Sequence, residues 1–443
     1  MFNIHSWYTV FQLRRLIRSK SKSRQEFQPQ PGNFLYVPAS CLPFHISGYT
    51  TRTHEILKNL QAACDKSGNR KLFVLTRTGY PWDRKDALSH PAKEDTFNIL
   101  DGIRYDHLRE PKNNSLTVFY AEAAAKEFEK YIIEHKISCV HAASNHVNAL
   151  PALIAARRLG IPFQYEMRGL WELTRISRCP EFAKSHNFKL GLDLEAFVAV
   201  HADRVFAISN QLSLYIQKNW GVKAKNIALL PNCADIDRIK PSDNVIVEND
   251  GDKEQKSDTV TIVYAGSLIV YEGIQTLLKA MSVLVYEKHK PVRLDILGDG
   301  EYRKNLEAMA SELKLDSYVR FLGRVSPEEA KRRQDSCGLV CIPREPFEVC
   351  QIVPPIKMVE AMAKEKCVIV PDLPVFRDEL GEGEPDSSGC IFFKSGDSED
   401  LARVLEENIF DKEGLAEKGR MARQYVIKHR QWNQYVGEVL PLC

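Results

Sequence analysis

Residues 259–266 read Thr-Val-Thr-Ile-Val-Tyr-Ala-Gly, a short run of β-branched and aromatic residues that ends in glycine. Such a run predicts a buried strand. Beyond it, helical and strand patterns alternate along the chain: helices at 273–286 and 302–313, and strands at 292–297, 319–322 and 338–342. Strands that alternate with helices of these lengths predict a parallel sheet covered by helices on both faces.

The first half of the chain shows the same alternation. Strand patterns occur at 33–38, 71–76, 137–141 and 162–166, and helical patterns at 53–60, 119–135 and 149–159. Because 443 residues exceed what one hydrophobic core usually supports, we expect an α/β fold of two doubly wound, Rossmann-like domains. Their expected boundaries are a basic extension at 1–30, a first domain at 31–235, a polar linker or insertion at 236–258, a second domain at 259–414, and a helical run at 415–443 that crosses back onto the first domain.

Composition excludes several classes of protein. Lys and Arg number 61 against 58 Asp and Glu, so no general electrostatic argument favours nucleic-acid binding. The 11 cysteines include no C-x-x-C pair, which favours neither a disulfide framework nor a zinc site, and we expect no metal and a reducing cytoplasm. No run of 18 apolar residues is present, so a conventional membrane span is not expected.

The first 25 residues have an unusual order of apolar and basic residues. Met1 to Leu16 is apolar and aromatic, and basic residues gather at its end and behind it, the reverse of a secretory signal. Two interpretations stay open: a solvated, poorly ordered extension, or a short amphipathic anchor that lies peripherally on the inner, anionic face of a membrane.

The segment Pro354 to Ala363 carries the most informative polar residues. Two prolines predict a helix that begins near Pro355, and its first turn then offers free N–H groups and the positive end of the helix dipole to a phosphate. Lys357 lies in that turn, Glu360 shares its face, and Arg344 follows the preceding strand. A cation and a carboxylate one turn apart suit a ribosyl diphosphate, although a solvated surface ion pair gives the same spacing.

Other candidate residues follow predicted strands, where doubly wound sheets bind ligands. Gly266 and Ser267 close the strand at 259–266, and Asn145 follows another strand with an amide suited to sugar hydroxyls. Arg168 is either an ion-pair hub between two acids or a ligand clamp. Further loop candidates that face the expected cleft are Ser47, Gly48 and Glu166.

The motifs together resemble the retaining glycosyltransferases of family 4, which have the GT-B fold. The likeness is collinear and spans nearly the whole chain beyond residue 30. It rests on Ser47-Gly48-Tyr49-Thr50, Leu230-Pro231-Asn232, Tyr264-Ala265-Gly266-Ser267 and Pro355 to Ala363. The resemblance implies a GT-B enzyme with two facing domains.

The resemblance also implies roles for individual residues. Glu360 would bind the ribose hydroxyls of the donor. The second glutamate that the family usually carries is replaced by Ile352, and the arginine and lysine of its diphosphate loop fall on Ser267 and Glu272. Our hypothesis is therefore that Arg344 and Lys357, with backbone N–H groups, neutralise the diphosphate, while Arg168 and Asn145 contact the sugar or the acceptor.

The implied activity is retaining transfer of a sugar from a nucleotide diphosphate donor to a glycan or lipid-linked acceptor, in polysaccharide or glycoconjugate biosynthesis. No cofactor and no essential metal are expected. Two alternatives remain: a sugar-nucleotide epimerase on the same fold, and a non-catalytic GT-B module that binds a glycan or a partner transferase.

Overall fold

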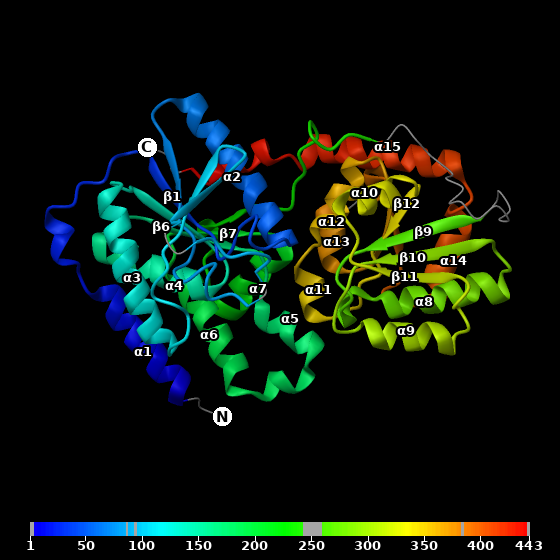
Figure 1. Ribbon diagram of the computed structural model, residues 1–443, viewed down its shortest axis with the longest axis horizontal. Coiled ribbons are helices and arrows are strands. Elements are labelled where there is room, and N and C mark those ends of the chain that lie inside the picture. The colour runs from blue at the N-terminus through cyan, green and yellow to red at the C-terminus, as the bar shows by residue number, and fades with distance from the viewer. Residues whose placement is uncertain (1–3, 86, 93–94, 242–258, 382–384, 441–443) are drawn as a thin grey trace. The chain divides into compact units, whose positions relative to one another are not determined.

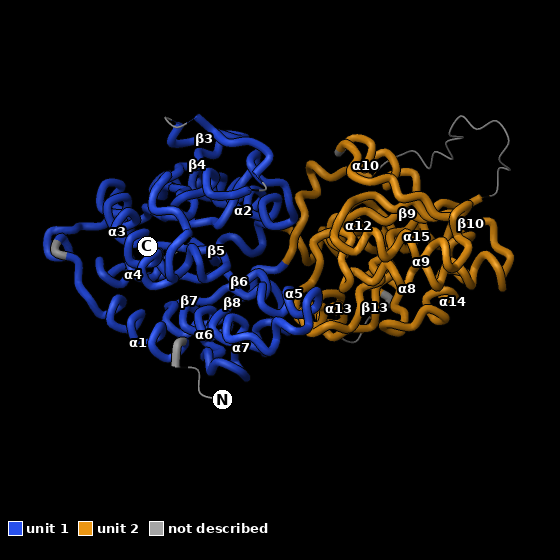
Figure 2. Tube along the Cα trace, turned by 60° about the horizontal axis from the view of Figure 1, so that its bottom comes forward, with its two compact units in different colours: residues 1–231, 432–443 blue, residues 232–431 orange. Residues whose placement is uncertain are grey.

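The computed structural model describes residues 4–85, 87–92, 95–241, 259–381 and 385–440. The chain forms two compact units (Figures 1 and 2). Unit 1 comprises residues 1–231 together with 432–443, and unit 2 comprises residues 232–431. Within the described residues, no helix has the length and apolar character needed to span a membrane. Most of the expected insertion at 236–258 lies outside the described residues.

Unit 1 is built on a six-stranded sheet in which every described pairing is parallel. Its order is β2-β1-β5-β6-β7-β8, so the first strand lies inside the sheet, with β2 on one side of it and β5 to β8 on the other. The strands are almost wholly buried from Phe34 to Val37 and throughout Phe163 to Met167. Their bounds are β1 (Asn33–Val37), β2 (Lys71–Val74), β5 (Cys139–Ala143), β6 (Phe163–Met167), β7 (Arg204–Ala207) and β8 (Ile227–Leu229).

Helices cover this sheet, as the alternation predicts. Helix α4 packs against α1, α3 and α6, whereas α2 packs against β2 and the last turns of the chain (Figure 1). An antiparallel hairpin of β3 (Phe97–Leu100) and β4 (Ile103–Asp106) is added to unit 1. The helices are α1 (Ile4–Arg18), α2 (Gly48–Ser67), α3 (Thr117–Glu134), α4 (His146–Leu159), α5 (Trp171–Arg178), α6 (His186–His201) and α7 (Asn210–Trp220).

Unit 2 contains two parallel three-stranded ladders, β11-β10-β9 and β12-β13-β14. Strand β12 lies alongside β9, so the strand order across the unit is β11-β10-β9-β12-β13-β14. This is the doubly wound order. Strands β10 and β11 are added on one side of β9, and strands β12 to β14 on the other side, so the strand order reverses between β9 and β12. The bounds are β9 (Val260–Ala265), β10 (Val292–Leu297), β11 (Val319–Gly323), β12 (Leu339–Cys341), β13 (Cys367–Pro371) and β14 (Cys390–Phe393).

Several helices of unit 2 pack against one another. Helix α8 packs against α9 and α14, and α12 packs against α15 (Figure 1). The helices are α8 (Ile274–Ser282), α9 (Arg303–Glu312), α10 (Pro327–Asp335), α11 (Glu348–Ile352), α12 (Ile356–Ala363), α13 (Pro374–Leu380), α14 (Ser398–Asn408) and α15 (Lys412–His429).

The chain end differs in detail from the helical run expected at 415–443. Helix α15 belongs to unit 2 and ends at His429. Short 3-10 turns at Trp432–Gln434 and Val436–Glu438 then belong to unit 1, where they pack on α2. The return to unit 1 is therefore made by a short irregular segment after the helix.

The N-terminal residues that the structure describes are ordered. Helix α1 packs on α3, α4 and α6, and Leu13, Ser6 and Thr9 are buried against them. A solvated and poorly ordered extension is therefore the wrong interpretation for residues 4–18. Other residues of α1 are apolar and exposed, including Trp7 and Phe11.

Candidate active site

The point where the strand order reverses is the place where a doubly wound sheet binds ligands. In unit 2 this point lies between β9 and β12. Gly266 and Ser267 follow β9, and Arg344 follows β12 by three residues. The topology therefore brings three of the predicted donor residues to one edge of the sheet.

Gly273 fixes the geometry of this edge. Its φ is +76°, and a Cβ at this position would lie 1.6 Å from the carbonyl oxygen of Pro343. Only glycine allows so close an approach of two backbones. The contact brings the segment before α8 against the segment after β12, and so brings Glu272 next to Arg344.

Glu272 is the centre of a buried group that we call the Glu272 cluster: Tyr264, Glu272, Arg344 and Lys357. Arg344 donates from Nε and Nη2 to Oε1 of Glu272, at 3.1 and 2.7 Å. Lys357 donates to the other oxygen, Oε2, and lies 3.2 Å from the hydroxyl of Tyr264, which itself donates to that oxygen at 3.1 Å. The carboxylate thus accepts hydrogen bonds from all three neighbours.

Charge explains the stability of this arrangement. Burial alone would raise the pKa of Glu272, but Arg344 and Lys357 lower it to about 2. The pKa of Lys357 is lowered, because burial and Arg344 outweigh the attraction of Glu272. One carboxylate against two cations leaves the cluster with one net positive charge at neutral pH. That charge lies at the N-terminal end of α12, where the helix dipole also favours an anion.

The two cations differ in what they offer to a ligand. Arg344 is 9% exposed, and its third nitrogen, Nη1, donates to the carbonyl oxygen of Val353 at 3.0 Å. The side chain of Lys357 is 24% exposed, and its Nζ lies 3.4 Å from where a Cβ would stand on Gly266. Lys357 is therefore the cation that a ligand beside Gly266 can reach, whereas Arg344 holds Glu272 in place.

The remaining donor candidates flank this cluster. Ser267 is exposed, and its carbonyl oxygen lies 3.2 Å from the hydroxyl of Tyr264. Glu360 is half-buried on α12, one turn after Lys357. Both belong to unit 2, like the Glu272 cluster.

Unit 1 has its own reversal point, between β1 and β5. Ser47 is the N-cap of α2, in a reciprocal capping box with Thr50, and Gly48 begins the helix as an exposed residue. Asn145 is the N-cap of α4, and its Oδ1 accepts a hydrogen bond from the backbone N–H of Val147 at 3.2 Å. A ligand at Asn145 would therefore meet the NH₂ group of the amide.

Arg168 and Glu166 are at the centre of a buried network. The five N–H donors of Arg168 are directed at acceptors in the protein: both oxygens of Glu166, the hydroxyls of Tyr36 and Thr53, and the carbonyl oxygen of Tyr49. The guanidinium also lies 4.3 Å from the centre of the Tyr49 ring. Of the two interpretations of Arg168, the geometry supports an ion-pair hub that positions other groups.

Glu166 is wholly buried and accepts further bonds from Arg52 and His141. Burial would raise the pKa of Glu166, but Arg168, His141 and Arg52 hold it well below its usual range. Glu166 is buried and its oxygens are bonded to other side chains, so it is not placed to contact a ligand directly. Arg52 was missed by the sequence analysis, because a single arginine within a helical pattern carries no signal of its partners.

Arg52 also contacts the two points at which the chain leaves unit 1 and returns to it. It donates to the carbonyl oxygens of Leu230 and Pro231, at 2.6 and 2.8 Å, where the chain leaves the unit. Its guanidinium lies 5.2 Å from the ring centre of Trp432, where the chain returns. The similarity of Leu230-Pro231-Asn232 to a junction segment agrees with the boundary between the units, at 231/232.

Two family models match the sequence. The glycosyl transferase 4-like domain matches residues 47–233, and the model for glycosyl transferases group 1 matches residues 246–428. Together they cover most of both units. The prediction of a glycosyl-transfer enzyme from the collinear motifs is confirmed.

Curated relatives match over part of their length. An uncharacterised glycosyltransferase of Haemophilus influenzae is 31% identical over 111 residues, 25% of this chain and 29% of the relative. The phosphatidyl-myo-inositol mannosyltransferase of Mycobacterium tuberculosis is 26% identical over 237 residues, 51% of this chain and 56% of the relative. The matches thus span less than a third of the first of these relatives and little more than half of the second.

Solved structures share the fold over almost the whole chain. Sucrose-phosphate synthase from Thermosynechococcus elongatus superposes with a TM-score of 0.71 and 15% identity, over 92% of this chain and 97% of that one. Anabaena HepE in complex with UDP-glucose gives a TM-score of 0.63 and 17% identity, over 92% and 99%. The motifs, the two doubly wound units and these matches agree, and the chain belongs to the family 4 glycosyltransferases of the GT-B fold.

Proposed function

We propose that this enzyme transfers a sugar, with retention of anomeric configuration, from a nucleotide diphosphate donor to a glycan or lipid-linked acceptor. The observation that carries the donor class is the position of Lys357. Its ammonium group is partly exposed beside Gly266 and next to the first turn of α12. A cation, a glycine loop and a helix N-terminus together suit a diphosphate.

The Glu272 cluster gives each donor residue a distinct task. Lys357 contacts the diphosphate directly, and an ammonium has three N–H donors, of which Glu272 and Tyr264 engage two. Arg344 acts through Glu272, which it fixes by two hydrogen bonds. Glu360 accepts hydrogen bonds from the two ribose hydroxyls, and Gly266 and Ser267 let the backbone approach the phosphates.

The protein's contribution to the reaction is then positioning and charge stabilisation. The bond from the anomeric carbon to the phosphate oxygen breaks as the acceptor oxygen bonds to the same carbon. The departing phosphate oxygen takes the proton of the acceptor hydroxyl, as the family resemblance implies, and no metal or cofactor is needed. Asn145 and the loop at Ser47 and Gly48 lie at the reversal point of unit 1 and form the acceptor side, while Arg168 and Glu166 hold that side in place.

A donor panel tests the reaction. The enzyme is incubated with UDP- and GDP-sugars, with and without glycan or lipid-linked acceptors, and free nucleotide is measured. Acceptor-dependent release of nucleotide supports transfer. Interconversion of sugars without an acceptor would replace the proposal by epimerisation, and no turnover with any donor would favour a binding module.

The donor residues are tested by nucleotide binding. Lys357→Met should weaken UDP or GDP binding at least about tenfold, since it removes a charge-assisted contact of roughly 1.5–3 kcal/mol. Lys279→Met, which removes an exposed lysine of α8, is the matched control. Equal affinity of wild type and Lys357→Met in calorimetry would refute the phosphate contact.

The ribose contact has a sharper test. Wild type should bind the 2′-deoxy nucleotide several-fold more weakly than the ribonucleotide, because one hydroxyl bonded to Glu360 is missing. Glu360→Ala, which has no acceptor at this position, should bind both with nearly equal affinity. If Glu360→Ala keeps the full preference for ribose, another residue recognises the hydroxyls.

We also propose that the enzyme binds peripherally to the cytoplasmic face of a membrane, and helix α1 supports this. Its outer face exposes Trp7, Tyr8 and Phe11, which are 56%, 55% and 45% exposed, and Trp7 stacks on Phe11 with ring centres 5.6 Å apart. Arg14, Arg15 and Arg18 follow at its end. Exposed aromatic residues beside basic ones suit an anionic lipid surface.

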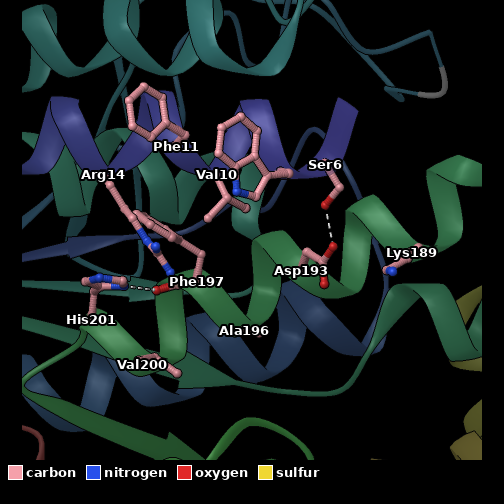
Figure 3. A pocket seen from close by; sticks show the side chains of 11 residues that line it. Ser6, Val10, Phe11, Arg14, Lys189, Asp193, Ala196, Phe197, Val200 and His201 are labelled. Carbon is pink, nitrogen blue, oxygen red and sulfur yellow. Dashed lines mark hydrogen bonds between the residues drawn. The ribbon is translucent and has the colours of Figure 1, made fainter. Parts of the chain in front are cut away.

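A hollow of about 410 Å³ lies between α1 and α6 (Figure 3). Val10, Phe197 and Val200 line it together with the basic side chains of Arg14 and Lys189. The exposed aromatic residues Trp7 and Phe11 line the hollow too, as does the acid Asp193, so the hollow adjoins the exposed side of α1. An acceptor carried on a lipid would reach the enzyme at such a surface.

Vesicle co-sedimentation tests this placement. Trp7→Ser with Phe11→Ser should lower binding to anionic vesicles, and Phe119→Ser, which removes an equally exposed aromatic residue at the start of α3, should not. Equal sedimentation of all three proteins would remove α1 from the proposal.

A further inference from the structure

Three side chains from three helices of unit 1 converge on one small volume. His146 begins α4, Glu172 lies in the first turn of α5, and Glu195 lies in α6. One ring nitrogen and one carboxylate oxygen from each glutamate all lie within 4.8 Å of one another. We call these residues the His146 cluster.

Glu195 is held in a fixed orientation. Its Oε1 accepts hydrogen bonds from the backbone N–H of His146 at 2.8 Å and lies 3.0 Å from the Nδ1 of the same residue. The hydroxyl of Tyr165 donates to its other oxygen. Carboxylates that ligate metals are usually oriented by such outer hydrogen bonds.

Glu172 has no comparable support. It is 1% exposed, and its Oε2 has no hydrogen-bond partner in the described structure. Its other oxygen lies against Gly191, where a Cβ would come within 2.3 Å of it, so a glycine there leaves room for the carboxylate. An unpartnered buried carboxylate oxygen costs free energy unless a proton or a cation joins it.

The charges of the cluster do not balance. When both glutamates are ionised, two carboxylates lie against one imidazole, and one negative charge is uncompensated even with His146 protonated. A buried charge without a partner is far more costly than a paired one. A divalent cation would satisfy the open oxygen of Glu172 and neutralise both carboxylates at once.

We propose that His146, Glu172 and Glu195 bind a divalent transition-metal ion, with zinc the best match. An imidazole nitrogen and two carboxylate oxygens are ligands that zinc accepts, in a tetrahedral site whose fourth position takes a water. Calcium and magnesium prefer oxygen ligands alone. The side chain of His146 is 14% exposed, which gives an ion a route in.

The consequence of such a site is structural. The metal would tie α4, α5 and α6 to one point. The segment just before α5 carries Arg168, the hub of the buried network, so the metal would also fix the loop that positions this arginine. The three ligands are distant in sequence, and no short motif indicates them.

Metal binding by the full chain is the first test. The protein is stripped with a chelator and titrated with Zn²⁺ in competition with a chromogenic chelator. Wild type should bind one zinc with an affinity at least about tenfold higher than Glu172→Gln. Glu181→Gln, which removes an exposed acid of the neighbouring turn, is the matched control and should bind like wild type.

The melting temperature distinguishes a metal ion bound by Glu172 from a proton bound by it. In chelator, Glu172→Gln should melt no lower than wild type, because it removes the uncompensated carboxylate. Added zinc should raise the melting temperature of wild type and leave that of Glu172→Gln unchanged. If zinc shifts neither protein, Glu172 is simply protonated and the proposal is wrong.

X-ray absorption at the zinc edge needs no variant. The zinc-loaded wild type should show only nitrogen and oxygen neighbours, one of them an imidazole. Sulfur neighbours would place the ion on some of the 11 cysteines and overturn the assignment.

Discussion

Replacing Glu272 with glutamine removes the charge at the centre of the Glu272 cluster. Glu272 is 5% exposed, and its pKa falls from the ordinary 4.5 to about 2 in the folded protein. A shift of about 2.5 units corresponds to about 3 kcal/mol of folding free energy. Glu272→Gln should therefore destabilise unit 2 by about 3 kcal/mol at pH 7, because the buried Arg344 and the partly buried Lys357 both lose their anion.

The pH dependence follows from the sign of this shift. A carboxylate whose pKa is lowered on folding contributes its full stability above the unfolded pKa, and that contribution is lost as the pH falls through the folded value. The difference between Glu272→Gln and wild type should thus be constant above pH 4.5 and shrink as the pH falls from 4.5 to about 2.

The distribution of tryptophan provides the assay. All five tryptophans, Trp7, Trp82, Trp171, Trp220 and Trp432, belong to unit 1. In a urea titration, tryptophan emission therefore reports unit 1, whereas far-UV circular dichroism reports both units. Glu272→Gln should shift the dichroism transition to lower urea and leave the emission transition of unit 1 much less changed.

A second readout runs in the opposite direction. Glu272→Gln raises the net charge of the cluster from one to two, so UDP or GDP should bind the folded variant more tightly than wild type. Glu417→Gln, an exposed acid on α15, should stay within about 0.5 kcal/mol of wild type. A loss below 1 kcal/mol for Glu272→Gln, or weaker nucleotide binding, would refute the account of the cluster.

Three further substitutions test other parts of the molecule. Gly273→Ala should destabilise unit 2 by at least about 2 kcal/mol, because its Cβ would collide with the carbonyl oxygen of Pro343, whereas Gly437→Ala meets no atom within 4 Å and should be nearly neutral in the same urea titration. Burial lowers the pKa of His107 to about 4 from 6.5, so wild type should lose about 3 kcal/mol of unit 1 stability as the pH falls from 6.5 to 4, and His107→Gln should flatten this slope in tryptophan emission. Arg168→Lys should cost unit 1 about 3 kcal/mol while nucleotide affinity stays unchanged; intact stability with lost transfer would instead indicate that Arg168 contacts a substrate.

The sequence predicted eight of the twelve strands in the parallel ladders that the structure describes, because a buried parallel strand needs an almost continuous apolar run. Strands β7, β8, β13 and β14 were not predicted. The strand expected at 292–297 and the observed β10 have the same bounds. The hairpin β3–β4 was missed, although Asp101-Gly102 between its strands is a common hairpin turn and both residues have positive φ. Its strands alternate in exposure and carry a weaker apolar signal.

The candidate site was predicted in its residues more than in their roles. Lys357, Arg344 and Gly266 come together, because the topology places them at one reversal point. Glu272 was noted only as the position where the family's lysine is missing. A sequence does not show that two distant cations share one carboxylate. The His146 cluster escaped for the same reason: burial and proximity between separate helices are properties of the fold.

Arg52 contacts the chain both where it leaves unit 1 and where it returns, and this affects the order in which the two units fold during synthesis. Unit 2 is one continuous stretch, residues 232–431, whereas unit 1 needs residues 432–443 as well. Trp432, Val436 and Val439 are buried against unit 1. During synthesis, unit 2 can therefore complete its fold before unit 1 does, and the face of α2 around Arg52 is covered only after residues 432–440 have left the ribosome.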